Sequence, residues 1–105
     1  MSKWVRTCAV DDVELEGVKR FDAGDLTLAI YRSPKGDFFA TDGHCTHEQV
    51  HLADGLVIDY TIECPKHSGL FDYRTGEALA PPVCVHLQCF KVKIEDGSVF
   101  VELPS

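Results

Sequence analysis

Two short cysteine–histidine pairs constrain this chain more than any other feature of its sequence. The first clip is Cys45-Thr46-His47 and the second clip is Cys64-Pro65-Lys66-His67, with sixteen residues between them. Thiolate and imidazole ligands together favour zinc or iron–sulfur chemistry over calcium or magnesium. Four such ligands complete the protein ligand set of a zinc ion, which would take all four, or of an iron–sulfur cluster, which would share them between irons. The fold must therefore bring the two clips together.

The rest of the chain carries mainly strand signals. Short segments rich in apolar and β-branched residues are separated by turn residues, among them the hairpin pair Asp96-Gly97. Frequent short strands predict an all-β fold, a small antiparallel sandwich or barrel. We expect strands at residues 4–8, 17–21, 26–32, 38–41, 56–58, 60–63, 70–72, 77–79, 90–95 and 99–103.

The two clips and their spacing resemble those of Rieske iron–sulfur proteins. The resemblance is specific from residue 45 to residue 82 and general outside that segment. It implies a Rieske-type [2Fe–2S] cluster in which Cys45 and Cys64 bind one iron and His47 and His67 bind the other. It also implies a single Rieske domain over 1–105. Its cluster-binding subdomain, at about 42–82, would be inserted into a β base made of 1–41 and 83–105.

The small size of the chain is most similar to the Rieske ferredoxins of bacterial ring-hydroxylating oxygenase systems. That resemblance implies a one-electron carrier that performs no bond chemistry on an organic substrate. It would accept electrons from a flavin reductase and deliver them to a terminal oxygenase. Two alternatives stay open, namely a small Rieske subunit of a nitrite-reductase-like complex and a zinc-stabilised β module that binds a partner.

Composition narrows the classes of partner. A length of 105 residues predicts one domain, and a formal net charge of −7 argues against nucleic acid as a ligand. The acidic balance suits docking on a basic patch of a protein, or solubility alone. The sequence contains no apolar run of transmembrane length and no secretory signal. We therefore expect a cytoplasmic monomer that exchanges partners.

Four positions depart from the high-potential members of the family. Those members carry a disulfide between the clip loops and Ser and Tyr hydroxyls near the cluster sulfurs, whereas this chain has Val50 and Lys66, and Gly69 and Phe71, at the matching positions. Hydrogen bonds to the sulfurs stabilise the reduced cluster, so their loss lowers the potential. We predict a midpoint near the low end of the Rieske range, about −150 mV. Ser68, one position earlier than the family serine, is a remaining hydroxyl that could reach a sulfur.

A second motif overlaps the first clip. Residues 47–51 read His-Glu-Gln-Val-His, which matches the zinc metalloprotease signature. That signature needs a helix, and the short segment between Gly43 and Gly55 does not favour one, so we reject the protease interpretation. We expect His44, His51 and His86 on the surface or in hydrogen bonds rather than on metal. His44 and His51 flank the first clip and are candidates to tune or shield the cluster.

The remaining features concern the thiols and the docking face. Cys8, Cys84 and Cys89 lie outside the clips, and we expect each to be a small buried apolar side chain. An odd total of five cysteines argues against a disulfide framework. Lys66 is expected to face the partner, and the resemblance implies that Ala80-Pro81-Pro82 forms a stiff loop over the cluster.

Overall fold

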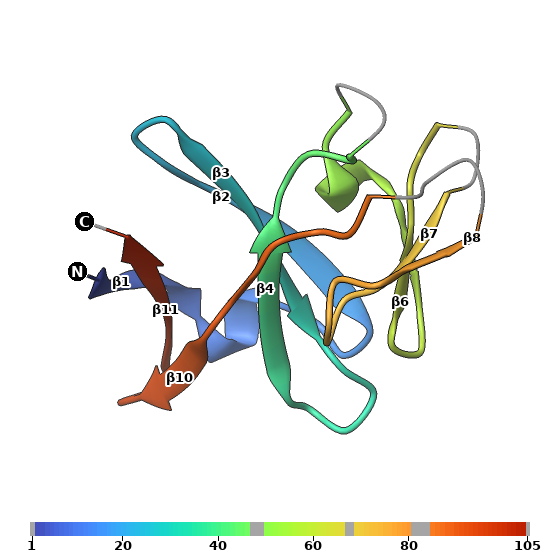
Figure 1. The fold of residues 1–105 in the computed structure, drawn as a ribbon. Coiled ribbons are helices and arrows are strands. Elements are labelled where there is room, and N and C mark those ends of the chain that lie inside the picture. Colours follow the sequence, from blue (N-terminus) through green and yellow to red (C-terminus); the bar gives the residue numbers. More distant parts are fainter. Residues whose placement is uncertain (1, 47–49, 67–68, 81–84, 105) are drawn as a thin grey trace.

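The computed structural model describes residues 2–46, 50–66, 69–80 and 85–104, and Figure 1 shows their fold. Within these ranges the chain forms strands and two short 3₁₀ helices, and no helix is long and apolar enough to cross a membrane. The 3₁₀ helices are η1 (Val10–Asp12) and η2 (Leu52–Asp54). The strands are β1 (Ser2–Ala9), β2 (Gly17–Ala23), β3 (Leu26–Arg32), β4 (Phe38–Asp42), β5 (Leu56–Ile58), β6 (Thr61–Glu63), β7 (Leu70–Asp72), β8 (Ala78–Ala80), β9 (Cys89–Phe90), β10 (Val92–Glu95) and β11 (Ser98–Pro104).

The strands form three antiparallel sheets, which confirms the predicted all-β class. Their orders are β1-β11-β10, β2-β3-β4-β9 and β5-β6-β7-β8. In Figure 1 the β2–β4 sheet lies between the β1, β10 and β11 strands on one side and the β6–β8 strands on the other. We use "base" for the first two sheets and "outer sheet" for β5–β8.

Strand β3 is buried on both faces, and its sequence explains why. Alternate residues of a strand point to opposite faces, so an apolar run without alternation suits a strand covered on both sides. Leu28 and Ile30 belong to the base core, a cluster of buried residues between the two base sheets. Ala29 and Tyr31 belong to the outer core, a second cluster shared with the outer sheet. Strand β3 is therefore the wall that separates the two cores.

Local turn signals place most of the hairpins. Asp96 and Gly97 have φ values of 51° and 76°, the positive pair that a type I′ hairpin requires, and they join β10 to β11 as predicted. The predicted strand at 90–95 is wrong in one respect, because it is divided at Lys91. Strand β9 pairs with β4, whereas β10 pairs with β11, so the chain crosses from one base sheet to the other at this residue.

Candidate metal centre

The first clip stands in a loop that leaves the end of β4. The backbone N–H of Gly43 donates to the carbonyl of Thr27 at 2.8 Å. His44 and His51 form an isolated antiparallel bridge where the two arms of the loop, residues 43–45 and 50–52, lie side by side, and we call these two arms the neck of the loop. Within the neck, the N–H of Cys45 donates to the carbonyl of Val50 at 3.0 Å. Cys45 is only 5% exposed. The loop therefore holds its thiol inward, against the protein.

The second clip occupies the loop of the β6–β7 hairpin. Glu63 and Leu70 pair across the end of the ladder, and the N–H of Cys64 donates to the carbonyl of Gly69 at 2.6 Å. Cys64 is 2% exposed. In both loops, then, the cysteine N–H bonds to the carbonyl five residues later. This shared backbone bond presents the two thiols in the same way.

The two thiols belong to one hydrophobic cluster. Cys45 and Cys64 both lie in the outer core, with Leu52 of η2 among its buried members. Gly55, which follows η2, lies so close to β6 that a Cβ atom there would collide with the carbonyl oxygen of Glu63. The first clip loop is thus packed against the residue that precedes the second clip.

His51, in the first clip loop, is hydrogen-bonded at both ring nitrogens. It is buried, its Nδ1 accepts from the N–H of Ala53 at 3.0 Å, and its Nε2 lies 2.9 Å from the hydroxyl of Thr27. Burial lowers the pKa of His51, and the nearby Arg20 and His44 lower it further. The expectation that His51 is hydrogen-bonded is confirmed. Its bond to a strand of the base was not predicted.

The other two histidines also agree with the sequence analysis. His44 is exposed, and exposed His86 accepts a hydrogen bond at Nδ1 from the N–H of Ala78. The end of the His-Glu-Gln-Val-His motif, His51, has extended backbone (φ −86°, ψ 133°), and its residues 47–49 lie outside the described residues. The described part of this motif is therefore not a helix.

The positions expected to set the potential are described in part. Gly69 and Phe71 are buried, Val50 is half-buried and Lys66 is exposed. His47 and His67, the predicted imidazole ligands, lie outside the described residues, as do Ser68 and the prolines of the predicted third loop. After that loop, the carbonyl of exposed Val85 accepts a hydrogen bond from the Thr46 hydroxyl at 2.8 Å. This contact, which ties the segment at residue 85 to the first clip, was missed.

The prediction that the remaining cysteines are buried is confirmed for one of them and wrong for another. Cys8 is buried in the base core as expected, and Cys84 lies outside the described residues. The prediction for Cys89 is wrong, because this residue is exposed. It belongs to a two-residue strand at the edge of its sheet, where few neighbours cover it. Its thiol lies 3.9 Å from the carbonyl of Tyr73, and partial burial raises its pKa.

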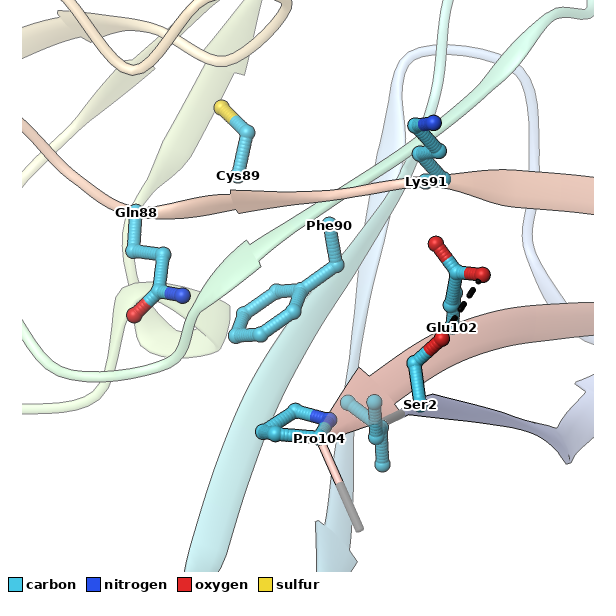
Figure 2. A pocket seen from close by; sticks show the side chains of 8 residues that line it. Ser2, Gln88, Cys89, Phe90, Lys91, Glu102 and Pro104 are labelled. Atoms are coloured by element: carbon cyan, nitrogen blue, oxygen red, sulfur yellow. Dashed lines mark hydrogen bonds between the residues drawn. The ribbon is translucent and has the colours of Figure 1, made fainter.

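A groove of about 540 Å³ on the base is distinct from the clips. In Figure 2 the ring of Phe90 faces Pro104, and the thiol of Cys89 points to the opposite side of β9. Ser2 donates a hydrogen bond to Glu102 within the groove. Neither Cys45 nor Cys64, the two predicted ligands that the structure describes, lines it, and the groove belongs to the junction of the base sheets. Its lining is Ser2, Gln88, Cys89, Phe90, Lys91, Glu102, Leu103 and Pro104.

An aromatic stack that we did not predict from the sequence joins the base to the outer sheet. The rings of Tyr31 and Tyr73 are parallel within 5°, with centroids 4.5 Å apart. The Tyr31 hydroxyl lies 2.8 Å from that of Thr41, and the Tyr73 hydroxyl donates to the carbonyl of Asp59 at 2.7 Å. Both tyrosines are fully buried. The stack therefore lies in the outer core, where it connects the wall strand β3 to the turn after β7.

The described half of the predicted ligand set fits an iron–sulfur group. Two buried thiols, held in equivalent loops at the outer core, offer the soft donors that such a group requires. Among the described residues no three His, Cys, Asp or Glu side chains gather as a metal site. The described residues thus include two of the four predicted ligands, Cys45 and Cys64.

Comparison with known proteins identifies the class. A family model described as "Rieske [2Fe-2S] domain" matches residues 3–91, and the chain belongs to this family. Members carry a Rieske-type cluster, which is the cofactor of this protein. The chain is 39% identical over 102 residues to the ferredoxin component of the naphthalene 1,2-dioxygenase system of Pseudomonas putida, covering 96% of each.

Solved structures narrow the identification within the family. The ferredoxin of Sphingomonas yanoikuyae B1 superposes with a TM-score of 0.92 at 36% identity, over 97% of this chain and all of the other. A chain from a complex of reduced oxygenase and oxidised ferredoxin in carbazole 1,9a-dioxygenase gives 0.88 at 35% identity, over 93% and 91%. The protein is accordingly a Rieske-type ferredoxin, an electron carrier rather than a catalytic component.

Proposed function

We propose that Cys45 and Cys64 bind one iron of the cluster and that His47 and His67 bind the other. The observation that carries this proposal is the pair of equivalent loops, each with a buried thiol whose N–H bonds to the carbonyl five residues on. A Rieske centre needs two thiolates on one iron and two imidazoles on the other. When bound, the cluster accepts and releases one electron. The protein residues hold it and shield it from water.

The ligand set is tested by spectroscopy of purified protein. We expect visible absorption bands and, after reduction, an EPR signal with two irons and two acid-labile sulfides per chain. His47→Cys and His67→Cys variants should retain colour but lose the Rieske EPR signature, because imidazoles on one iron give this signature. A colourless protein with one zinc per chain would contradict the proposal and support the zinc-module alternative.

The proposed partners are a flavin reductase as donor and a terminal oxygenase as acceptor. Support comes from relatives that are named as components of dioxygenase systems and from the related ferredoxin in complex with an oxygenase. The cluster-binding subdomain is proposed at about 42–82, within a base of 1–41 and 83–105. We further propose a cytoplasmic monomer, in keeping with the thiols Cys8 and Cys89, which form no disulfide.

Docking is proposed around the clips, where Thr46, Lys66 and Val85 are exposed. Lys66→Glu should change the rate of electron transfer and its dependence on salt without bleaching the cluster, because charge at a docking face acts mainly on association. Lys35→Glu, in the turn between β3 and β4, is the control for the same change of net charge. Equal rates for both variants at low salt would exclude a docking role for Lys66.

A low potential completes the proposed function. Gly69 and Phe71 contribute no side-chain hydrogen bond to the cluster sulfurs, so we propose a midpoint potential of about −150 mV. Phe71→Tyr should raise the midpoint if the new hydroxyl reaches a sulfur. The matched control is Phe100→Tyr on the base. A wild-type midpoint above about 0 mV by potentiometric titration would contradict the proposal.

A further inference from the structure

The imidazole of His51 joins the neck of the first clip loop to strand β3. Its Nδ1 accepts a hydrogen bond from the N–H of Ala53 at 3.0 Å, so Nδ1 carries no proton. In the uncharged ring the proton then lies on Nε2, which donates to the hydroxyl of Thr27 at 2.9 Å. His51 is 5% exposed, and burial lowers its pKa, which favours the uncharged ring. Both nitrogens therefore have a partner of the right kind.

The hydrogen bond to Thr27 continues to the protein surface. The Thr27 hydroxyl donates to a carboxylate oxygen of Asp22, and the Arg20 guanidinium donates to both oxygens of Asp22 at 3.2 Å. These hydrogen bonds lower the pKa of Asp22, so the carboxylate is an ionised acceptor. The hydrogen bonds from His51 to Asp22 thus pair each donor with an acceptor. The Thr27 hydroxyl accepts from His51 and donates to Asp22.

The backbone around the ring leaves it little freedom. Gly43 donates to the carbonyl of Thr27 at 2.8 Å, and Leu52 donates to the carbonyl of Gly43 at 2.7 Å. A Cβ atom at residue 43 would collide with the Nε2 atom of His51. The ring therefore packs directly on the backbone of Gly43, two residues before Cys45.

Whereas the first clip loop is bonded to β3 by the side chain of His51, the loop of the second clip is restrained by strand pairing. Its neck continues into the β6–β7 ladder, where three residue pairs align the two strands. Among the described residues of the first clip loop, strand pairing is limited to the His44–His51 bridge, because β4 ends at Asp42 and η2 begins at Leu52. At the first clip, the side-chain bond from His51 to Thr27 adds to the backbone bond from Gly43 to Thr27 and restrains the loop against β3, as strand pairing restrains the second clip.

We propose that His51 is a positioning residue for the iron–sulfur site, which acts through its hydrogen bond to Thr27. This bond fixes the first clip loop, and with it Cys45, against the base. The inference rests on the proposed ligand set, because it matters for electron transfer only if Cys45 binds iron. Without the bond, the loop should sample a wider range of positions, and the environment of the cluster should become less uniform.

Two single substitutions remove the bond from opposite ends. His51→Asn keeps an acceptor for the N–H of Ala53, because asparagine is a preferred N-cap residue, but its side chain is too short to reach Thr27. Thr27→Val preserves the shape and the β-branching of the strand residue while removing the hydroxyl. Thr7→Val is the matched control, since Thr7 is also a half-buried strand threonine, and it donates to the carbonyl of Val99 in the base.

The measurements use the cluster-loaded protein. We expect broader EPR lines in the reduced state and iron loss to a ferrous chelator about threefold to tenfold faster for His51→Asn and for Thr27→Val, the kinetic equivalent of one hydrogen bond. The double variant should be no worse than Thr27→Val alone, because that substitution already removes the bond to His51 together with the bond to Asp22. Thr7→Val should match the wild type in line width and in rate of iron loss. If His51→Asn does not fold, Thr27→Val and its control decide.

Two results would overturn the inference. One is that His51→Asn and Thr27→Val match Thr7→Val in both line width and iron loss. The other is that the effects of the single variants add in the double variant, which would show that they are independent. Wild-type protein without iron and sulfide would instead refute the proposed function, and the inference with it, so the two failures are distinguishable.

Discussion

The two cores of this protein differ in the chemistry of their buried residues. The base core is a cluster of small and aliphatic side chains around Leu28, Ile30 and Val101. The outer core contains the two clip thiols, two stacked tyrosines and Phe71. The stability of such a core depends on burial and close packing. The outer core holds the groups that the proposed cluster would bind, so its stability should depend on the cofactor as well as on packing.

The two cores share strand β3, but they should respond differently to damage. A defect in the base core should lower the stability of the whole domain and leave the cluster environment intact. A defect in the outer core should reduce stability and also change how firmly the cluster is held. Matched substitutions in the two cores can therefore test whether the cofactor is coupled to one core or to both.

The largest effect is expected from replacing one thiol in each core. Cys64→Ser should abolish the visible spectrum and the reducible signal, because it removes a proposed ligand. Cys8→Ser, at a buried thiol of the base core, should keep the full spectrum and lose about 1–2 kcal/mol of unfolding free energy, the cost of burying a hydroxyl. Absorbance and thermal unfolding measure both. A coloured Cys64→Ser protein with an unchanged EPR signal would contradict the coupling.

A pair of buried leucines gives the next largest effect. Leu52 lies in the outer core and Leu28 in the base core, and both are fully buried. Each change to alanine should cost about 2–5 kcal/mol, because it leaves a cavity. Only Leu52→Ala should also accelerate the loss of iron to a chelator, since η2 packs beside the first clip loop. Equal acceleration in both variants would mean that the rate of iron loss depends on the stability of the whole protein and not on the outer core in particular.

Much of this architecture could be predicted from local sequence, and the exceptions have a common cause. The hairpin at Asp96-Gly97 and the unbroken apolar run of β3 are local signals, and the structure agrees with both. The division of the chain at Lys91 and the stack of Tyr31 on Tyr73 depend on which distant segments meet. No pattern within a short window encodes such pairings, because the partners are set by the packing of whole sheets.

The bond between His51 and Thr27 was hidden for the same reason. Its partners are separated by twenty-four residues, and a histidine beside a metal motif offers several roles of equal plausibility. The first clip loop approaches β3 closely because Gly43 has no side chain. This approach, which the sequence does not reveal, brings His51 within hydrogen-bond distance of Thr27.

A smaller effect is expected at Tyr73, and it depends on pH. Tyr73→Phe keeps the ring but removes the hydrogen bond to the carbonyl of Asp59, at a cost of about 0.5–1.5 kcal/mol at neutral pH. Burial raises the pKa of Tyr73 to about 12. The neutral phenol therefore contributes stability that is complete below the pKa of the unfolded chain, about 10, and is lost as pH rises towards 12.

Alkaline unfolding curves test this dependence on the outer core. Between pH 10 and 12 the wild type should lose more stability than Tyr73→Phe, because the variant has no phenol at this position to ionise. Tyr60→Phe, at a less buried ring of the same region, is the control. Parallel curves for the wild type and Tyr73→Phe would show that ionisation of this residue does not limit alkaline stability.

The smallest effect is expected at Asp72, the last residue of strand β7 in the outer sheet. Asp72 accepts hydrogen bonds from the side chain and the backbone N–H of Arg74, and these contacts lower its pKa. Asp72→Asn should cost about 0.5–1 kcal/mol at pH 7, because the pair is partly exposed to solvent.

The sign of the pH effect follows from the lowered pKa. The stability supplied by the Asp72 carboxylate is present above the unfolded pKa, about 3.9, and is lost as pH falls through the lower folded value. The difference between wild type and Asp72→Asn should therefore shrink as pH falls below about 3.9. Urea titrations at pH 7 and about pH 3 measure this change, and a difference that is undiminished at the lower pH would assign the effect to packing rather than to charge.

Strand β3 has a consequence for how the protein opens. Because one face of it lines each core, neither core can separate from the other without exposing the strand that both require. Its amides should exchange with solvent deuterium only through unfolding of the whole domain, whereas those of edge strand β5 should exchange through local fraying. Separation of the two cores would then be a single cooperative event of the whole domain, and partly opened forms that expose strand β3 would be rare.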